Sequence, residues 1–251
     1  MSRGTTPLPA PRGTADPARR PRWPVPADIT KPPLSGAAHW IGVPLLRSFW
    51  RIRSLGTHHV PLGGPVILAG NHTNFADGPL LYAFSPRPVH FWIKQEMFTG
   101  VLDPVLRGIG HIPVSRGSAD RGMIMSSLKV LQAGNALGVF PEGTRGAGDF
   151  AEVHNGLAYL AMRSGAPIVP VACLGTGERG ASIGSLPAFR AKIDVVYGKP
   201  FLPAPDTGKR SRRAVTDASE RIVERLTAHL HEAERLTGRA AKVPAGADAR
   251  A

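Results

Sequence analysis

The chain has 251 residues, enough for one α/β domain with a well-filled core, and its 31 Lys and Arg against 18 Asp and Glu give a formal charge of +13. Its one cysteine, Cys173, excludes a disulfide framework and a thiolate metal cage, so we expect no metal site and a reducing compartment. No stretch reaches the roughly 18 apolar residues of a spanning helix, and no signal-peptide pattern is present, so we expect a protein kept in the cytoplasm.

The positive charge is not confined to the ends of the chain. Residues 1–35 carry +4 and residues 205–251 carry +3, which leaves +6 of the +13 for residues 36–204. A basic surface suits an anionic partner, such as lipid headgroups, a phosphorylated substrate or nucleic acid. Charge alone does not distinguish among these partners.

Two N-terminal segments differ in composition. Residues 1–35 are rich in Pro and Arg and poor in large aliphatic residues, which predicts disorder. Residues 36–54 predict an amphipathic helix, with Arg47 and Arg51 opposite a wide apolar arc and with Pro44 able to kink it. Such a helix lies either in the interface of an anionic membrane or against the domain, and the two arrangements are compatible. The apolar arc consists of Trp40, Ile41, Val43, Leu45, Leu46, Phe49, Trp50 and Ile52.

Residues 55–238 predict a single domain in which strands alternate with helices, followed by a flexible tail at 239–251. Strands are expected at 65–70, 89–94, 108–116, 137–140, 168–174 and 191–197. Helices are expected at 77–83, 101–107, 123–133, 155–163 and 213–237, the last ended by Gly238. This alternation indicates an α/β fold with a largely parallel central sheet flanked by helices.

A histidine and an aspartate follow the first of these strands. Residues 71–77 read Asn-His-Thr-Asn-Phe-Ala-Asp, and Asp77 precedes Gly78 and Pro79 at a predicted helix start. We therefore expect the Asp77 carboxylate to turn back toward His72 at the end of the strand. A histidine held by a carboxylate suits proton abstraction from an alcohol. The alternative is that Asp77 only caps the helix.

Two further polar clusters follow predicted strands, namely Arg116 and the run Glu142-Gly143-Thr144-Arg145. In a parallel sheet these strand ends share one edge, so a base, two arginines and a glutamate can line one pocket. This set suits activation of a hydroxyl on a substrate that carries phosphate. The run 175–180 matches a dinucleotide fingerprint, but no predicted helix opens at its end, which argues against a cofactor site.

Four segments occur in an order that resembles a known family. They are Asn71-His72-x4-Asp77, Gly110 to Arg116, Phe140 to Arg145, and Ala166 to Pro170. They are similar to the four motif blocks of the glycerolipid acyltransferase (HX4D) family, specifically the 1-acylglycerol-3-phosphate acyltransferases. The resemblance covers about residues 55–200. His154 stands where the family has a lysine, shortly before Gly156.

The resemblance implies transfer of an acyl chain from acyl-CoA, a co-substrate, or from acyl carrier protein to the free hydroxyl of a lysophospholipid, giving phosphatidic acid. It implies His72 as general base and Asp77 as its orienting group. It also implies substrate contacts from Asn71, Arg116 and residues 142–145, at the cytoplasmic face of the membrane, to which the protein binds peripherally. No further cofactor is implied.

Direct attack by a lipid hydroxyl on a thioester needs a base but no enzyme nucleophile. Two alternatives remain at this stage. One is an acyltransferase for another lysolipid or a glycolipid, and the other is a non-catalytic basic protein that binds anionic membranes. No recognition motif or aromatic platform supports binding of nucleic acid.

Overall fold

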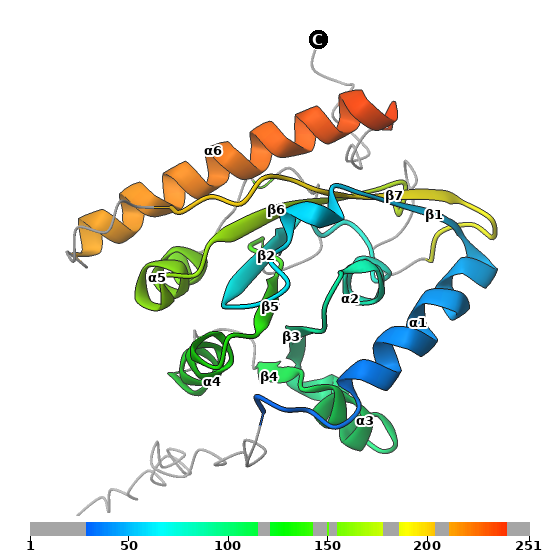
Figure 1. Cartoon of the computed structure of the whole chain (residues 1–251), viewed down its shortest axis with the longest axis horizontal. Helices are drawn as coiled ribbons and strands as arrows, with labels where there is room; N and C mark the ends of the chain where they lie inside the picture. The colour runs from blue at the N-terminus through cyan, green and yellow to red at the C-terminus, as the bar shows by residue number, and fades with distance from the viewer. Residues whose placement is uncertain are drawn as a thin grey trace, which may run out of the picture.

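Short apolar runs form the strands of a central sheet in the computed structural model (Figure 1), which describes residues 29–114, 121–142, 150, 155–177, 186–203 and 211–239. Within these residues the sheet has seven strands in the order β1-β7-β6-β2-β5-β3-β4. The strands are β1 Arg51–Leu55, β2 Val66–Gly70, β3 Val89–Lys94, β4 Ile112–Val114, β5 Ala136–Val139, β6 Ile168–Leu174 and β7 Lys192–Tyr197.

Neighbouring strands from β6 to β4 are parallel, as in the pairs β2 with β6, β2 with β5, β3 with β5, and β3 with β4. Strand β7 pairs antiparallel with β6, and β1 pairs parallel with β7. Five strands therefore run in one direction, and the β1–β7 pair runs in the other. The expected α/β fold with a largely parallel sheet is confirmed.

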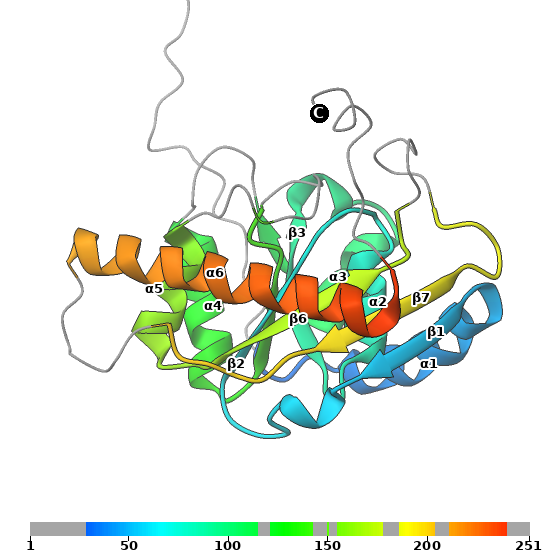
Figure 2. The same ribbon diagram turned by 90° about the horizontal axis from the view of Figure 1, so that it is seen from above.

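Helices cover both faces of the sheet. They are α1 Ser35–Phe49, α2 Asp77–Phe84, α3 Leu102–Ile109, α4 Arg121–Gln132, α5 Asn155–Ser164 and α6 Arg212–Thr237, with short 3-10 turns at Thr57–His59 and Gln95–Met97. Helices α4, α5 and α6 pack on one face, and α1, α2 and α3 lie on the other. Figure 2 shows α6 lying across β6.

Strand β2 shows how one short strand joins two cores. Ile67 and Ala69 pack into the core under α4, α5 and α6, whereas Val66 and Leu68 pack into the core under α1 and α2. Side chains alternate between the faces of a sheet, so a strand covered on both faces is apolar at every position. All five residues of β2 are buried, as this arrangement requires.

The predicted amphipathic helix at 36–54 is shorter in the structure, and the expectation for its last residues is wrong. Helix α1 ends at Phe49, Trp50 is extended, and residues 51–55 form β1 against β7. The Trp50 backbone leaves the helix with φ −132° and ψ 155°, and its indole donates a hydrogen bond to the Pro187 carbonyl at 3.2 Å. Arg47 lies over the ring of Phe84 in α2, on the protein side of the helix.

The other predicted elements agree with the observed ones to within a few residues, except in the strand expected at 108–116. There β4, described as Ile112–Val114, begins later than predicted, because α3 continues to Ile109 and Gly110 ends it with a positive φ of 91°. At the other end of the chain α6 ends at Thr237, and Gly238 has a φ of 66°. Of residues 1–35, for which the sequence predicted disorder, 1–28 lie outside the described residues, but Ile29 is buried in the core and Ser35 begins α1, so the expectation is wrong for residues 29–35. Of the tail predicted at 239–251, Arg239 is described and pairs with Asp194, and residues 240–251 lie outside the described residues, as do residues 115–120.

Candidate active site

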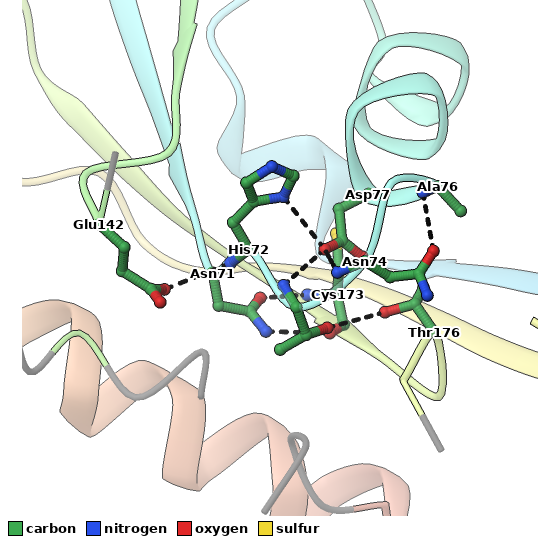
Figure 3. A network of polar contacts seen from close by, with 9 residues as sticks. Asn71, His72, Asn74, Ala76, Asp77, Glu142, Cys173 and Thr176 are labelled. Atoms are coloured by element: carbon green, nitrogen blue, oxygen red, sulfur yellow. Dashed lines mark hydrogen bonds and ion pairs between the residues drawn. The ribbon is translucent and has the colours of Figure 1, made fainter. Parts of the chain in front are cut away.

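The loop between β2 and α2 brings His72 and Asp77 together, as the sequence predicted. Strand β2 ends at Gly70, α2 begins at Asp77, and Nδ1 of His72 lies 3.3 Å from Oδ2 of Asp77 (Figure 3). A carboxylate oxygen can only accept a hydrogen bond, so Nδ1 carries the proton and Nε2 presents its lone pair. None of the described residues hydrogen-bonds to Nε2, which points away from the network.

Backbone amides fix the Asp77 carboxylate. Oδ2 also accepts the N–H of Thr73 at 2.8 Å and the N–H of Asn74 at 2.7 Å. Asp77 is fully buried and is the first residue of α2, so it does not cap the helix as an N-cap residue would. Its Oδ2 atom instead fixes the preceding loop by accepting hydrogen bonds from two backbone amides of that loop, and the same atom contacts the His72 ring.

The histidine ring is held on its face as well as at Nδ1. The rings of His72 and Phe140 stack with centroids 4.2 Å apart and planes 17° apart. Phe140 comes directly after β5, and the register pairs Val139 with Ala69 in β2, so the two strand ends lie side by side. The His72 side chain keeps 18% of its surface exposed, which leaves it open to a substrate.

Glu142 and Thr176 contact the loop from opposite sides (Figure 3). The Glu142 Oε1 accepts the backbone N–H of His72 at 3.2 Å, and the Thr176 hydroxyl lies 3.2 Å from the hydroxyl of Thr73. Both Glu142 and Thr176 are buried. The loop thus depends on contacts from the ends of β5 and β6.

Asn71 has a different position from the substrate contact expected of it. It is fully buried, its Nδ2 donates to the Cys173 carbonyl at 3.1 Å, and its Oδ1 accepts the Cys173 N–H at 2.7 Å. Its amide therefore joins the end of β2 to β6 and does not face a substrate. The expectation for Asn71 is corrected on this ground.

The remaining predicted site residues, Arg116 and residues 143–145, lie outside the described residues, as does His154. The strands that precede Arg116 and residues 143–145 are described: β4, before Arg116, ends at Val114, and β5, before residues 143–145, ends at Val139. Both strands run parallel to β2, so their carboxyl ends lie at the same edge of the sheet as His72.

The loop after β6 was missed by the sequence analysis as part of this site. Gly175 has a φ of 83°, and a Cβ at this position would lie 2.4 Å from the Lys192 carbonyl oxygen, so only glycine fits the turn. This turn places Thr176 against Thr73. The available signal was the position of Thr176 directly after a buried strand, at the edge where β2 also ends.

A protein-family model described as Acyltransferase matches residues 51–174, from the start of β1 to the end of β6. The chain belongs to the acyltransferase family. The matched residues of this acyltransferase include the His72–Asp77 loop and the predicted clusters at Arg116 and residues 142–145.

Individual proteins that resemble this acyltransferase share only a quarter to a third of the aligned residues with it. A 1-acyl-sn-glycerol-3-phosphate acyltransferase of Bacillus subtilis (strain 168) is 24% identical over 177 residues, which cover 70% of this chain and 86% of that protein. A lyso-ornithine lipid O-acyltransferase of Pseudomonas aeruginosa is 33% identical over 111 residues, which cover 43% of this chain and 42% of that protein.

A solved structure shares the fold of the acyltransferase. The crystal structure of the 1-acyl-sn-glycerophosphate (LPA) acyltransferase PlsC from Thermotoga maritima matches with a TM-score of 0.59 at 21% identity. The match covers 79% of this chain and 80% of that one.

Cys173 of the acyltransferase is not placed to act as a nucleophile. The residue is buried, and burial together with the nearby Asp77 charge raises the pKa of its thiol well above the usual value. A thiol in this environment stays protonated and unreactive. Its backbone serves the site through the bonds to Asn71.

Proposed function

We propose that this acyltransferase transfers an acyl chain from acyl-CoA, or from acyl carrier protein, to the free hydroxyl of 1-acylglycerol-3-phosphate, giving phosphatidic acid. The observation that carries the proposal is the His72 ring, whose Nδ1 is bound to the buried Asp77 while its outer nitrogen and part of its surface are open. The Bacillus subtilis relative, a 1-acyl-sn-glycerol-3-phosphate acyltransferase, supports this choice of acceptor.

The reaction needs one base and no covalent enzyme intermediate. Nε2 of His72 takes the proton of the acceptor hydroxyl while the hydroxyl oxygen attacks the thioester carbonyl carbon. The imidazolium that forms lies beside the Asp77 carboxylate, which stabilises its charge. Collapse of the tetrahedral intermediate breaks the C–S bond, and the departing thiolate takes the proton back from His72.

The acceptor phosphate requires cations, and we assign it to Arg116 and Arg145. Guanidinium groups bind phosphate through paired hydrogen bonds. Gly143 and Thr144 are assigned to the same phosphate-binding loop, where glycine allows close approach of the backbone. Glu142 begins this loop, and its bond to the His72 amide links phosphate binding to the position of the base.

We assign the enzyme to the cytoplasmic face of the membrane as a peripheral protein, because α1 exposes large apolar side chains. Trp40, Ile41 and Leu45 are exposed, whereas Ala38, Val43 and Leu46 on the other face of the helix pack on the domain. An exposed apolar helix face on a basic protein suits the interface of an anionic bilayer. No helix in the described part of the chain combines the length and the apolar character needed to cross that bilayer.

Purified His72→Ala protein tests the proposed function. Thiol release from acyl-CoA is measured in the presence of 1-acylglycerol-3-phosphate, and kcat is expected to fall by about 10²–10⁴ because the general base is lost. His231→Ala is the matched control, since His231 is an exposed histidine of α6 paired with Glu234. A His72→Ala enzyme that retains the wild-type rate would remove the assigned base.

A second acceptor is favoured by the relative from Pseudomonas aeruginosa, a lyso-ornithine lipid O-acyltransferase. His154, at the position where the family has a lysine, also leaves room for another lysolipid or a glycolipid. Thiol release across a panel of lysolipids separates these acceptors by kcat/KM. Vesicle binding without thiol release for any acceptor would instead indicate a non-catalytic basic membrane-binding protein.

A further inference from the structure

Phe140 lies between the core of the domain and the face of the His72 ring. Its ring stacks with the ring of His72, with centroids 4.2 Å apart, and with the ring of Phe91, with centroids 5.8 Å apart and planes at 21°. Phe91 is buried in β3, so Phe140 is supported from behind. The three rings form a continuous stack from the sheet to the candidate base.

The Phe140 ring lies next to Gly70 and Gly78. A Cβ at Gly70 would lie 3.3 Å from Cε1 of Phe140, which is a tight contact, whereas a Cβ at Gly78 would lie at an ordinary contact distance of 4.0 Å from its Cε2. Gly70 ends β2 and Gly78 follows Asp77 in the first turn of α2, so the ring is wedged between the two elements that flank the His72 loop. Phe140 therefore has little freedom to move relative to this loop.

The hydrogen bond to Asp77 does not by itself fix the plane of the His72 ring. At 3.3 Å it is longer than the 2.8 Å and 2.7 Å bonds that the same oxygen accepts from Thr73 and Asn74. The imidazole turns about its Cβ–Cγ bond, and a single hydrogen bond of this length at Nδ1 opposes such turns only weakly, although each turn would swing Nε2 away from a bound hydroxyl. Stacking on Phe140 opposes the rotation because tilting the ring would separate the faces or push them together.

We propose that Phe140 is a positioning residue that fixes the plane of the His72 imidazole and thereby aims Nε2 at the acceptor hydroxyl. The inference rests on the proposed function of His72 as the general base. Phe140 touches neither substrate nor the reacting atoms in this scheme and acts only through His72. Its ring face also suits the imidazolium that forms during transfer, since aromatic faces attract cations.

The full-length variant Phe140→Leu tests the proposal by kinetics, because it keeps an apolar side chain but removes the stacking face. We expect kcat to fall about 10- to 100-fold, since a base misplaced by about 1 Å loses rates of this order. We expect KM for the lysolipid to change by less than about threefold, because Phe140 does not bind substrate. Phe84→Leu, which removes the same atoms from the same core at the far end of α2, should leave kcat unchanged.

A spectroscopic measurement tests the stacking without reference to activity. In histidine-labelled protein, with the His72 signals identified by their loss in His72→Gln, the ring current of Phe140 should move the His72 ring protons upfield. Phe140→Leu should abolish this shift, whereas Phe84→Leu should retain it. If the leucine variant folds poorly, Phe140→Met keeps more of the side-chain volume and serves for the same comparison.

A Phe140→Leu or Phe140→Met enzyme with the wild-type kcat, or with unchanged His72 ring signals, would overturn the proposal. Failure of the proposed function has a different outcome, because the wild type would then release no thiol or His72→Ala would remain active. In that case the ring-proton shifts alone decide whether Phe140 holds His72: loss of the upfield shift in the leucine variant supports the inference, and its persistence refutes it.

Discussion

Replacing Asp77 by asparagine removes the charge of the carboxylate while keeping the shape of the side chain. In the wild type, Oδ2 accepts hydrogen bonds from two backbone amides and from His72, and the carbonyl oxygen of asparagine can accept the same three. The NH2 group then occupies the place of Oδ1, which is buried and has no hydrogen-bond partner among the described residues. A buried donor without an acceptor costs about 1–3 kcal/mol, so the free energy of unfolding should decrease by this amount.

The expected loss of activity is much larger than this loss of stability implies. A domain with about 5–15 kcal/mol of stability remains folded after such a change. The imidazolium of His72 would form beside a neutral amide, so its charge would lack the carboxylate that stabilises it, and kcat should fall by about 10²–10⁴. This range applies because the site keeps its shape and loses only the charge.

Thiol release at saturating lysolipid measures kcat, and urea unfolding followed by circular dichroism measures stability. Asp103→Asn is the control, because it also changes a carboxylate to an amide, in a partly exposed i to i+4 pair with Arg107 on α3. It should change kcat little and the unfolding free energy by no more than about 0.5 kcal/mol.

A double variant tests the coupling of the two residues directly. If His72 and Asp77 act as a unit, His72→Ala with Asp77→Asn is no slower than His72→Ala alone. Multiplicative losses in the double variant, or a nearly wild-type kcat in Asp77→Asn despite lower stability, would refute the assignment of Asp77 as the group that orients the base.

Three further predictions concern stability and membrane binding. Asn71→Ala leaves the buried N–H and carbonyl of Cys173 without their partners and should lower the urea-unfolding free energy by about 2–5 kcal/mol; an unchanged midpoint would contradict this. Burial raises the pKa of the Asp194 carboxyl, but hydrogen bonds and charges from Arg53 and Arg239 outweigh burial, so the pKa lies below its usual value. Its stabilising contribution is therefore present above the unfolded pKa of about 3.9 and is lost as pH falls below it, and Asp194→Asn should flatten the acid limb of stability measured against pH. Trp40→Glu should weaken sedimentation with anionic vesicles by about tenfold or more, while Leu236→Glu, an exposed residue of α6, should not; equal effects would argue against α1 as the membrane contact.

Patterns within short segments predicted most of the fold, and the exceptions have physical reasons. Exposure alternates along Arg51 to Leu55, as in an edge strand, but the residue types Arg-Ile-Arg-Ser-Leu do not alternate strictly, and Trp50 and Ile52 also fit the helical spacing of the preceding segment. Only the pairing of β1 with β7 separates the two interpretations, and pairing is a long-range property. The antiparallel direction of β7 is long-range in the same way.

The contacts of the candidate site are likewise of two kinds, those predicted from local sequence and those that depend on the pairing of distant strands. The contact of His72 with Asp77 joins residues five positions apart, so the turn and the helix start predicted it. Asn71, Phe140 and Thr176 act across neighbouring strands, and their contacts depend on the register of β2 with β5 and β6. No local pattern specifies that register, which is why Asn71 was expected to meet substrate and Thr176 was missed.

Because the β1–β7 pair runs opposite to the other strands, the exposed connection from β1 to β2 lies far from the His72 loop. The connection from β1 to β2 enters the sheet at the amino end of β2, opposite the edge that holds His72. Its residues Leu62, Gly63 and Gly64 are exposed, and Arg87 donates hydrogen bonds to the carbonyls of Pro61 and Gly64. A fluorophore or an affinity peptide inserted between Leu62 and Gly63 would thus label or immobilise the enzyme without obstructing the edge of the sheet that holds His72.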